Sequence, residues 1–366
     1  MIKSRTIALA LTAAALALPA AGETLEAMKQ RNEAYGNELE RYFRDYLVTQ
    51  YPQRAAKAWH RNYENEQAFL KSVEPNRERY RLMFSPPALK PSGSLERKPY
   101  PAVPGVKAEW LTLPLGLIKA DALLVIPENL TRPVPLVIAQ HGIDSYPERV
   151  FGVGDDQGLY HDYGHVLVKA GFAVLAPIHL SYVPNRNRIE RLARLAGTTL
   201  PGIELRRLQL LLDEILKDKR IDGQRIGMWG ISLGGMATMF FTPLDPRIKC
   251  GIVTAWFNQR RNKMVIPDSR YSCFLETKEE HAFFRGWLTE FTDSDVASLI
   301  CPRPLLIQTG KKDGIAWWPQ VIEEFEASKE HYKKLGIADR IEMDLHDGGH
   351  EIRVESGVKF LDKWLR

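Results

Sequence analysis

The pentapeptide Gly230–Gly234 has the form G-x-S-x-G and carries the strongest chemical signal in the sequence. A sharp turn between a strand and a helix can expose a serine hydroxyl as a nucleophile, and flanking glycines permit the tight backbone of that turn. The apolar run Ile226–Trp229 precedes the motif, and residues 235–240 can continue as a helix. The alternative is a purely structural, glycine-rich helix start. Because strand and helix signals flank the motif, we predict that Ser232 is a nucleophile.

A serine needs a base that takes its proton and an acid that orients the base. Asp313 directly follows the apolar run Leu305–Gln308. His350 lies in a glycine-rich loop after a predicted strand at Ile341–Leu345. Both side chains are therefore placed at the carboxyl ends of strands, and acid and histidine follow the serine in that order. We predict a triad of Ser232, Asp313 and His350.

Other residues could take these two roles. Asp293, Asp295 and Glu276 could each supply the acid, but none of them directly follows a predicted strand. His346 could be the base, but it lies within or at the end of a strand, where alternation fixes the side-chain direction. The glycines before His350 instead allow its loop to reach over the strand ends.

A serine nucleophile forms a tetrahedral intermediate, whose negative oxygen needs backbone N–H donors. One predicted donor is the amide of Leu233, the residue after the nucleophile. The other is predicted in the loop after the apolar run Leu136–Ala139, from the amide of Ile143 or Gly142. Taken alone, the His141–Gly142 pair would be only a strand-ending turn.

The segments that interrupt the strand and helix pattern are predicted to border the substrate, because loops at the carboxyl ends of parallel strands surround the ligand. The candidates are Arg188, Arg191, Arg260 and Trp317. The arginines would suit an acidic substrate such as a uronate or dicarboxylate ester, although they could also form a solvated helix face. The tryptophan could equally form a buried corner of the core.

No metal site is predicted. His161 and His165 are four residues apart, a spacing that can bind zinc on a helix, but the sequence offers no third ligand beside them. The predicted chemistry needs no metal ion and no organic cofactor.

Apolar runs alternate with helical stretches along most of the chain, which predicts a parallel sheet with helices packed against it. The runs are Leu136–Ala139, Phe172–Ala176, Ile226–Trp229, Gly251–Trp256 and Leu305–Ile307, and a last strand is predicted at Ile341–Leu345. Before them, Lys107–Leu113 and Leu117–Ile126 are predicted to form an antiparallel pair. A helix over Val354–Trp364 is predicted to end the chain.

The sequence begins like a secretory signal. Lys3 and Arg5 precede the uncharged run Thr6–Leu18, and small residues follow it, with cleavage expected after Ala20 or Gly22. The run is short for a membrane span, so a retained anchor is the less favoured alternative. The predicted organisation is a signal peptide at 1–22, a helical segment at 23–84, a proline-rich connector at 85–106, and a catalytic domain at 107–366 with insertions near 181–200 and 258–298.

Composition excludes several classes. With 366 residues, 45% hydrophobic residues and 3 cysteines, the chain is neither a disordered protein nor a disulfide-stapled miniprotein. Acidic and basic residues are interleaved around a formal net charge of +5, so no nucleic-acid partner is predicted. In an exported protein, Cys250, Cys273 and Cys301 could form one disulfide and leave one free thiol, but the sequence does not select the pair.

The strand before Gln140–Gly142, the elbow around Ser232, Asp313 and His350 together resemble the α/β-hydrolase superfamily. Within it, residues 208–255 are similar to the dienelactone-hydrolase and acetyl-xylan-esterase-like group. The resemblance covers roughly residues 107–366. It implies an α/β-hydrolase fold, with a mostly parallel central sheet and helices on both faces. Dienelactone hydrolases use a cysteine where this chain has a serine, which implies an esterase.

The sequence therefore predicts a secreted or periplasmic serine esterase that forms an acyl-enzyme from a small-molecule or carbohydrate ester. One alternative is a serine peptidase of the prolyl-oligopeptidase type, which normally carries a β-propeller where this chain has a short helical segment. Another is a non-catalytic binding protein on the same fold, although such proteins usually lack a triad member. Stable membrane insertion is not expected after signal cleavage, and the N-terminal helices are a candidate oligomer interface.

Overall fold

The computed structural model describes residues 24–366, so the predicted signal peptide lies outside the described residues. The chain divides into two compact units between Tyr46 and Leu47. The described part of the first unit contains the helix α1 (Leu25–Arg44), which confirms the predicted N-terminal helix. The Thr24 side chain accepts a hydrogen bond from the amide of Ala27 and caps this helix, and none of the residues of α1 is buried.

The second unit, residues 47–366, is built on a sheet of nine strands in the order β1-β2-β3-β5-β4-β6-β7-β8-β9. Strands β5, β4, β6, β7, β8 and β9 are parallel, and β1, β2 and β3 add an antiparallel edge. This confirms the predicted mostly parallel sheet. The strands are β1 (Glu96–Pro99), β2 (Ala108–Leu115), β3 (Ile118–Val125), β4 (Val134–Gln140), β5 (Ala173–Pro177), β6 (Ile221–Ile231), β7 (Ile248–Thr254), β8 (Leu305–Gly310) and β9 (Ile341–His346).

The proline-rich segment 85–106 contains a strand that the sequence did not indicate. Strand β1 pairs antiparallel with β2, with Glu96 opposite Thr112. Its residues are charged or proline and none is buried, so it has no apolar alternation from which a strand could be recognised. Charged residues and proline are typical of an edge strand that is kept from pairing further.

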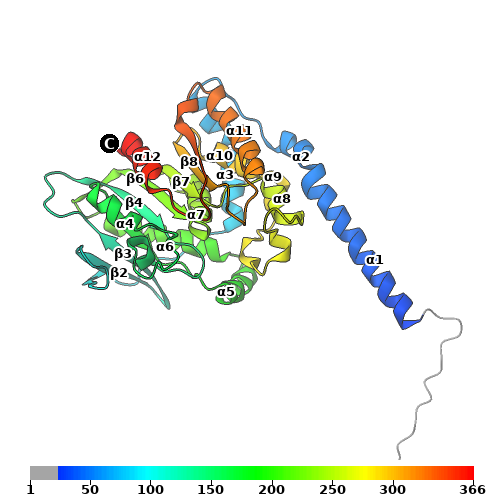
Figure 1. The fold of residues 1–366 in the computed structure, drawn as a ribbon, viewed down its shortest axis with the longest axis horizontal. Coiled ribbons are helices and arrows are strands. Elements are labelled where there is room, and N and C mark those ends of the chain that lie inside the picture. Colours follow the sequence, from blue (N-terminus) through cyan, green and yellow to red (C-terminus); the bar gives the residue numbers. More distant parts are fainter. Residues whose placement is uncertain (1–23) are drawn as a thin grey trace, which may run out of the picture. The chain divides into compact units, whose positions relative to one another are not determined.

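Helices cover both faces of the sheet (Figure 1). In the second unit the helices of seven or more residues are α2 (Tyr51–Ala58), α3 (Glu66–Phe84), α4 (Tyr163–Lys169), α5 (Val183–Leu195), α6 (Leu200–Ile215), α7 (Leu233–Phe241), α10 (Asp293–Ile300), α11 (Trp318–Lys334) and α12 (Val354–Leu365). Shorter helices include α8 (Arg260–Val265) and α9 (Trp287–Glu290). The insertion 181–200 thus contains α5, and the insertion 258–298 contains α8, α9 and most of α10.

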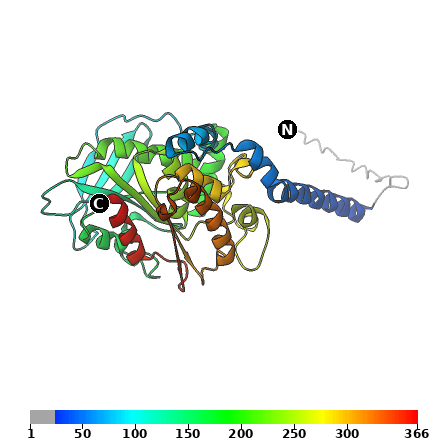
Figure 2. The ribbon, with the colours of Figure 1, turned by 90° about the horizontal axis from the view of Figure 1, so that it is seen from above.

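Two hydrophobic cores lie on opposite faces of the sheet, because successive strand side chains point to opposite sides. On β4, Leu136 and Ile138 belong to a core with α3, α6, α7, α10 and α11. The intervening Val137 and Ala139 belong to a second core with α4 and α12. Figure 2 shows the red α12 on one side of the sheet and the blue α3 on the other. Burial on both faces explains the continuous apolar runs in the sequence.

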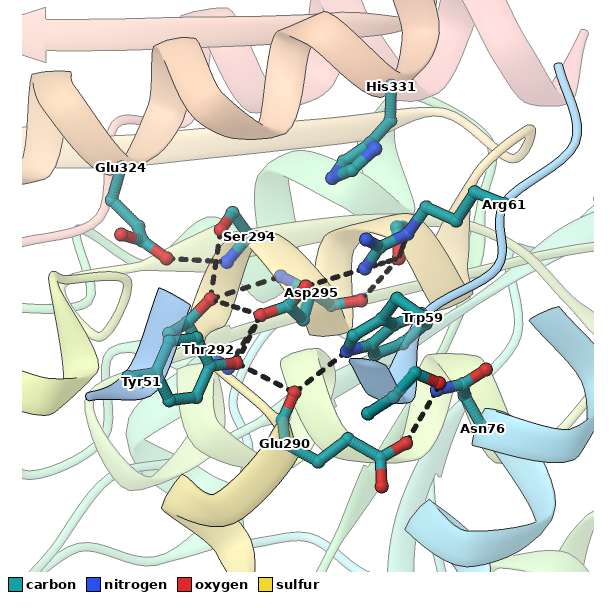
Figure 3. A network of polar contacts seen from close by, with 12 residues as sticks. Tyr51, Trp59, Arg61, Asn76, Glu290, Thr292, Ser294, Asp295, Glu324 and His331 are labelled. Carbon is teal, nitrogen blue, oxygen red and sulfur yellow. Dashed lines mark hydrogen bonds and ion pairs between the residues drawn. The ribbon is translucent and has the colours of Figure 1, made fainter. Parts of the chain in front are cut away.

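A buried polar network joins α2 to the second insertion (Figure 3). The Tyr51 hydroxyl contacts the Asp295 carboxylate and the Glu290 carbonyl. Arg61 pairs with the same Asp295 carboxylate at 2.6 Å. We call these four residues the Tyr51 network. It fixes the insertion 258–298, which borders the candidate site, against the N-terminal part of the second unit.

The three cysteines are free, buried thiols, so none of the disulfide pairings that the sequence left open is formed. Cys250 lies on β7, Cys273 in the second insertion and Cys301 at the end of α10. Burial raises the pKa of Cys250 to about 12 and also raises the pKa of Cys301, which disfavours the reactive thiolate.

Within residues 24–366, none of the helices has the length and apolar character needed to cross a bilayer.

Candidate active site

Ser232 lies in the turn between β6 and α7 with φ 58° and ψ −118°, a backbone conformation that a non-glycine residue rarely adopts. Its amide donates to the Thr254 carbonyl at 2.9 Å, which holds the turn against β7. A Cβ atom on Gly230 would lie 2.3 Å from the Gly234 carbonyl oxygen, and one on Gly234 would lie 2.1 Å from the Gln140 carbonyl oxygen. The motif therefore needs glycine because the turn packs on itself and on the end of β4.

Asp313 and His350 lie in the loops after β8 and β9, and these adjacent strands bring the loops together. The distance between Nδ1 of His350 and Oδ2 of Asp313 is 2.9 Å. Oδ1 of Asp313 accepts the amide of Ile315 at 3.1 Å, so both carboxylate oxygens have partners. The carboxylate is buried, whereas the His350 side chain is 27% exposed. With Nδ1 facing the acid, Nε2 is the nitrogen available to exchange a proton with a serine.

A cavity of about 220 Å³ opens beside these groups. It is lined by Ile143, Ser232, Leu233, Ala255, Trp256, Asn258, Lys263, Ser272, Phe274, Glu279, His281, Ile315, Ala316 and His350. The predicted nucleophile, base and two of the predicted oxyanion donors thus share one cavity. Asp313 lies behind His350, buried from solvent.

Two of the residues predicted to supply oxyanion donors, Leu233 and Ile143, line the cavity together with Ser232. Leu233 is the first residue of α7, where amides have no partner within the helix and the helix dipole favours negative charge. The Gly142 amide instead donates to the Tyr160 hydroxyl at 2.9 Å. Of the two alternatives at the end of β4, this leaves the amide of Ile143, which lines the cavity.

Two buried histidines fix the loop after β4. The His141 ring accepts the His179 amide at Nε2, 3.1 Å away, so its proton lies on Nδ1 and faces the Gly142 carbonyl 3.0 Å away. Burial lowers the pKa of His141 to about 4 and that of His179 to about 3. Both rings are therefore neutral at pH 7, and His141 holds the loop with a fixed tautomer.

The residues predicted to border the substrate do not line this cavity. Arg260 is fully buried and pairs with Asp293 at 2.7 Å, so its charge is neutralised inside the insertion. Arg191 is exposed and pairs with Glu280, and Arg188 is exposed on α5. The Trp317 ring is covered by the Arg270 guanidinium at 3.7 Å. Two of the arginines of α5, Arg191 and Arg194, join the two insertions, because both contact residues 280–283.

Two of the rival acids, Asp293 and Asp295, and the rival base His346 have other partners. Asp293 neutralises Arg260, and Asp295 belongs to the Tyr51 network. His346 accepts a hydrogen bond from the Gly348 amide at 3.2 Å and helps to shape the loop that carries the base.

His161, one of the two histidines at zinc-like spacing, pairs with Glu351. Across residues 24–366, no group of three or more His, Cys, Asp or Glu side chains could hold a metal ion.

Three ionisable residues in the cavity lining, Lys263, Glu279 and His281, were not selected from the sequence. They come from the insertion 258–298, which was predicted to border the substrate as a segment. Their spacing gives no periodic signal, because Lys263 lies on the short helix α8, Glu279 outside any helix or strand, and His281 in a single 3₁₀ turn. From the sequence, Lys263 cannot be told from an ordinary surface lysine, but in the structure it is only 3% exposed.

The chain resembles known proteins in sequence and in fold. It is 27% identical over 272 residues to the Bacillus subtilis protein named "Putative hydrolase YtaP", covering 70% of this chain and 88% of that protein. A Bacteroides fragilis structure named as a putative acetyl xylan esterase superposes with TM-score 0.61 and 18% identity, over 78% of this chain and 77% of that one. A glucuronoyl esterase from Solibacter usitatus superposes with TM-score 0.59 and 15% identity, over 81% and 94%. No family model matches the sequence.

These superpositions, over 78% and 81% of this chain, show that it shares the fold of both structures. The chain has the α/β-hydrolase fold, as its sequence motifs predicted.

Proposed function

We propose that this protein is a serine hydrolase that cleaves carboxylic esters through Ser232. The contact of 2.9 Å between His350 and Asp313, beside the cavity that Ser232 lines, carries the proposal. The names of the relatives support the same class of reaction, since both solved structures are named as esterases and YtaP as a hydrolase.

In this mechanism Ser232 attacks the ester carbonyl carbon while Nε2 of His350 takes the hydroxyl proton. Asp313 orients the ring and stabilises its positive charge. The amides of Leu233 and Ile143 hold the oxyanion, and the proton passes from His350 to the departing alcohol. A water molecule, deprotonated by His350, then attacks the acyl-enzyme; the acid is released as the proton passes from His350 to the Ser232 oxygen.

The size of the cavity supports a short acyl group. Sites that bury a drug-sized ligand have volumes of roughly 300–1,000 Å³. The cavity beside Ser232 holds about 220 Å³, which suits a short acyl chain and leaves a larger alcohol outside. A small-molecule or carbohydrate ester fits this arrangement, and the named activities of the structural relatives are consistent with it.

The test is hydrolysis of p-nitrophenyl acetate by wild type and by Ser232→Ala. We expect the substitution to lower kcat by at least about 10⁴-fold, because no other nucleophile replaces the serine. Ser72→Ala makes the same chemical change on α3, away from the cavity, and should retain full activity. Retention of most activity by Ser232→Ala would remove the nucleophile assignment.

A substrate panel separates the proposed activity from its rivals. Wild type should hydrolyse short-chain aryl esters and at least one of acetylated sugars or uronate methyl esters. Faster cleavage of proline-containing peptides than of every ester would favour the peptidase alternative. No turnover and no labelling of Ser232 by a fluorophosphonate would favour a binding protein.

A further inference from the structure

Lys263 is a buried cation that connects the second insertion to the loop that carries Asp313. Its Nζ donates to the Ser272 carbonyl at 2.5 Å, to the Ser272 hydroxyl at 2.7 Å and to the Ile315 carbonyl. An ammonium group has three N–H donors and no acceptor, so these three oxygens accept all the hydrogen bonds that a charged lysine can donate. Lys263 therefore has no donor left for a substrate.

Ile315 links this cation to the acid of the proposed triad. Its carbonyl accepts from Lys263, and its amide donates to Oδ1 of Asp313 at 3.1 Å. The other oxygen of Asp313 is 2.9 Å from Nδ1 of His350. A continuous chain of hydrogen bonds thus runs from the insertion to the ring that is to act as the base.

We propose that Lys263 is a positioning residue for the triad: its ammonium fixes Ile315, and through Ile315 the carboxylate of Asp313 that orients His350. The proposal rests on the ester hydrolysis proposed above. Because the lysine acts through Asp313 and His350, its loss should lower kcat and leave KM unchanged. A displaced triad member reacts slowly even when the substrate is bound normally.

The surroundings of Lys263 make this role sensitive to pH. Burial is the main cause that lowers its pKa, to about 8, and Arg260 on the same helix adds to the effect. The carboxylates of Glu279 in the insertion and of Asp313 in the loop after β8 oppose this shift, as does Cys273 when its thiol is ionised. Deprotonation leaves two N–H donors and a lone pair, so one of the three oxygens loses its bond. The charged form, and the ordered loop, are therefore present below about pH 8 and are lost above it.

The experiment measures kcat and KM for p-nitrophenyl acetate from pH 6 to 10. Wild type should lose kcat above about pH 8. Lys263→Met should lower kcat by about tenfold at pH 7 and abolish this alkaline loss, because a hydrogen bond from a charged group is removed. Lys263→Arg keeps the charge at every pH tested and should retain kcat at pH 9. Lys278→Met makes the same change at an exposed site of the insertion and should match wild type.

A second variant tests the chain without replacing the lysine. Ser272→Ala removes one of the three acceptors and weakens the charged form, so the alkaline loss of kcat should move to lower pH. Thermal unfolding of each variant checks that it is folded.

The outcomes separate this proposal from the proposed function. If wild type shows Ser232-dependent hydrolysis but Lys263→Met keeps the wild-type kcat and pH profile, the positioning role is refuted and the esterase stands. A rise in KM with constant kcat would also refute it, because it would mean that the lysine contacts substrate. If wild type lacks Ser232-dependent hydrolysis and fluorophosphonate labelling, both proposals fail.

Discussion

At the scale of single residues, the candidate site depends on close backbone approach more than on side-chain contacts. Ser232 has a strained backbone, and Gly234 allows the start of α7 to touch the carbonyl of Gln140. The end of β4 lies beside the nucleophile, since a Cβ atom on Gly142 would be 3.4 Å from Cβ of Ser232. Strained backbone of this kind persists only where the surrounding structure enforces it.

We therefore expect Gly234→Ala to lower kcat for p-nitrophenyl acetate by about 100-fold, because the new Cβ would displace β4 from the turn. It should also lower the free energy of unfolding by about 1–3 kcal/mol, as overpacking against rigid backbone does. Gly223→Ala, on strand β6 before the turn, would meet only a Leu216 side chain at 3.6 Å and serves as the control. Equal activity of the two variants would contradict the role of this contact.

At the scale of elements, the second insertion is tied to the rest of the second unit by buried polar groups. Arg260 and Asp293 neutralise each other inside it, and the Tyr51 network joins it to α2. On α11, Glu324 accepts the amide of Ser294 at 2.7 Å (Figure 3). Such contacts explain how a segment with little regular structure can form a wall of the cavity.

Glu324 should make stability depend on pH. Burial, and then the nearby negative charge of Asp293, raise its pKa from 4.5 to about 7. The folded state therefore retains a proton that the unfolded state releases, and this stabilisation is full below about pH 4.5 and is lost as the pH rises through about 7. We expect its contribution to the free energy of unfolding to fall by up to about 3 kcal/mol over that range.

The measurement is urea unfolding of wild type and Glu324→Gln at several pH values from 4.5 to 8. Glutamine resembles the protonated acid and does not titrate, so the difference between the two proteins isolates this group. Wild type should lose stability relative to Glu324→Gln as the pH rises. A difference that stays constant with pH would show that Glu324 is ionised, or equally protonated, in both states.

At the scale of the whole molecule, the chain consists of two units that differ in how many apolar residues they bury. The second unit buries apolar residues on both faces of its sheet, whereas α1 in the first unit buries none. The apolar residues of α1, including Leu25, Tyr35 and Tyr42, are exposed. Self-association through the N-terminal helices stays a prediction, which size-exclusion chromatography of the chain with and without residues 24–46 would examine.

Export is the second prediction at this scale. The charged start, the apolar run Thr6–Leu18 and the small residues after it should direct the protein out of the cytoplasm. N-terminal sequencing of protein produced from the full chain should then show a mature start after Ala20 or Gly22. A protein that begins at Met1 would contradict the signal assignment and the predicted secreted or periplasmic location.

The sequence by itself predicted the fold class, the elbow and the candidate triad, because each has a local signature. Strands buried on both faces leave continuous apolar runs, and Ser232 and Asp313 follow such runs closely, whereas His350 follows the mixed strand β9. The edge strand β1 was missed because its four charged or proline residues lack that signature.

Only the tertiary structure decided which charged residues face the cavity. The sequence drew attention to the arginines, but Arg260 is paired inside the insertion and Arg191 on the surface, whereas Lys263 reaches the loop of Asp313. The partners of these long side chains come from segments that are distant along the chain, and irregular backbone fixes their direction. Local periodicity reports burial within one element, but the neutralisation of a charge depends on contacts between elements.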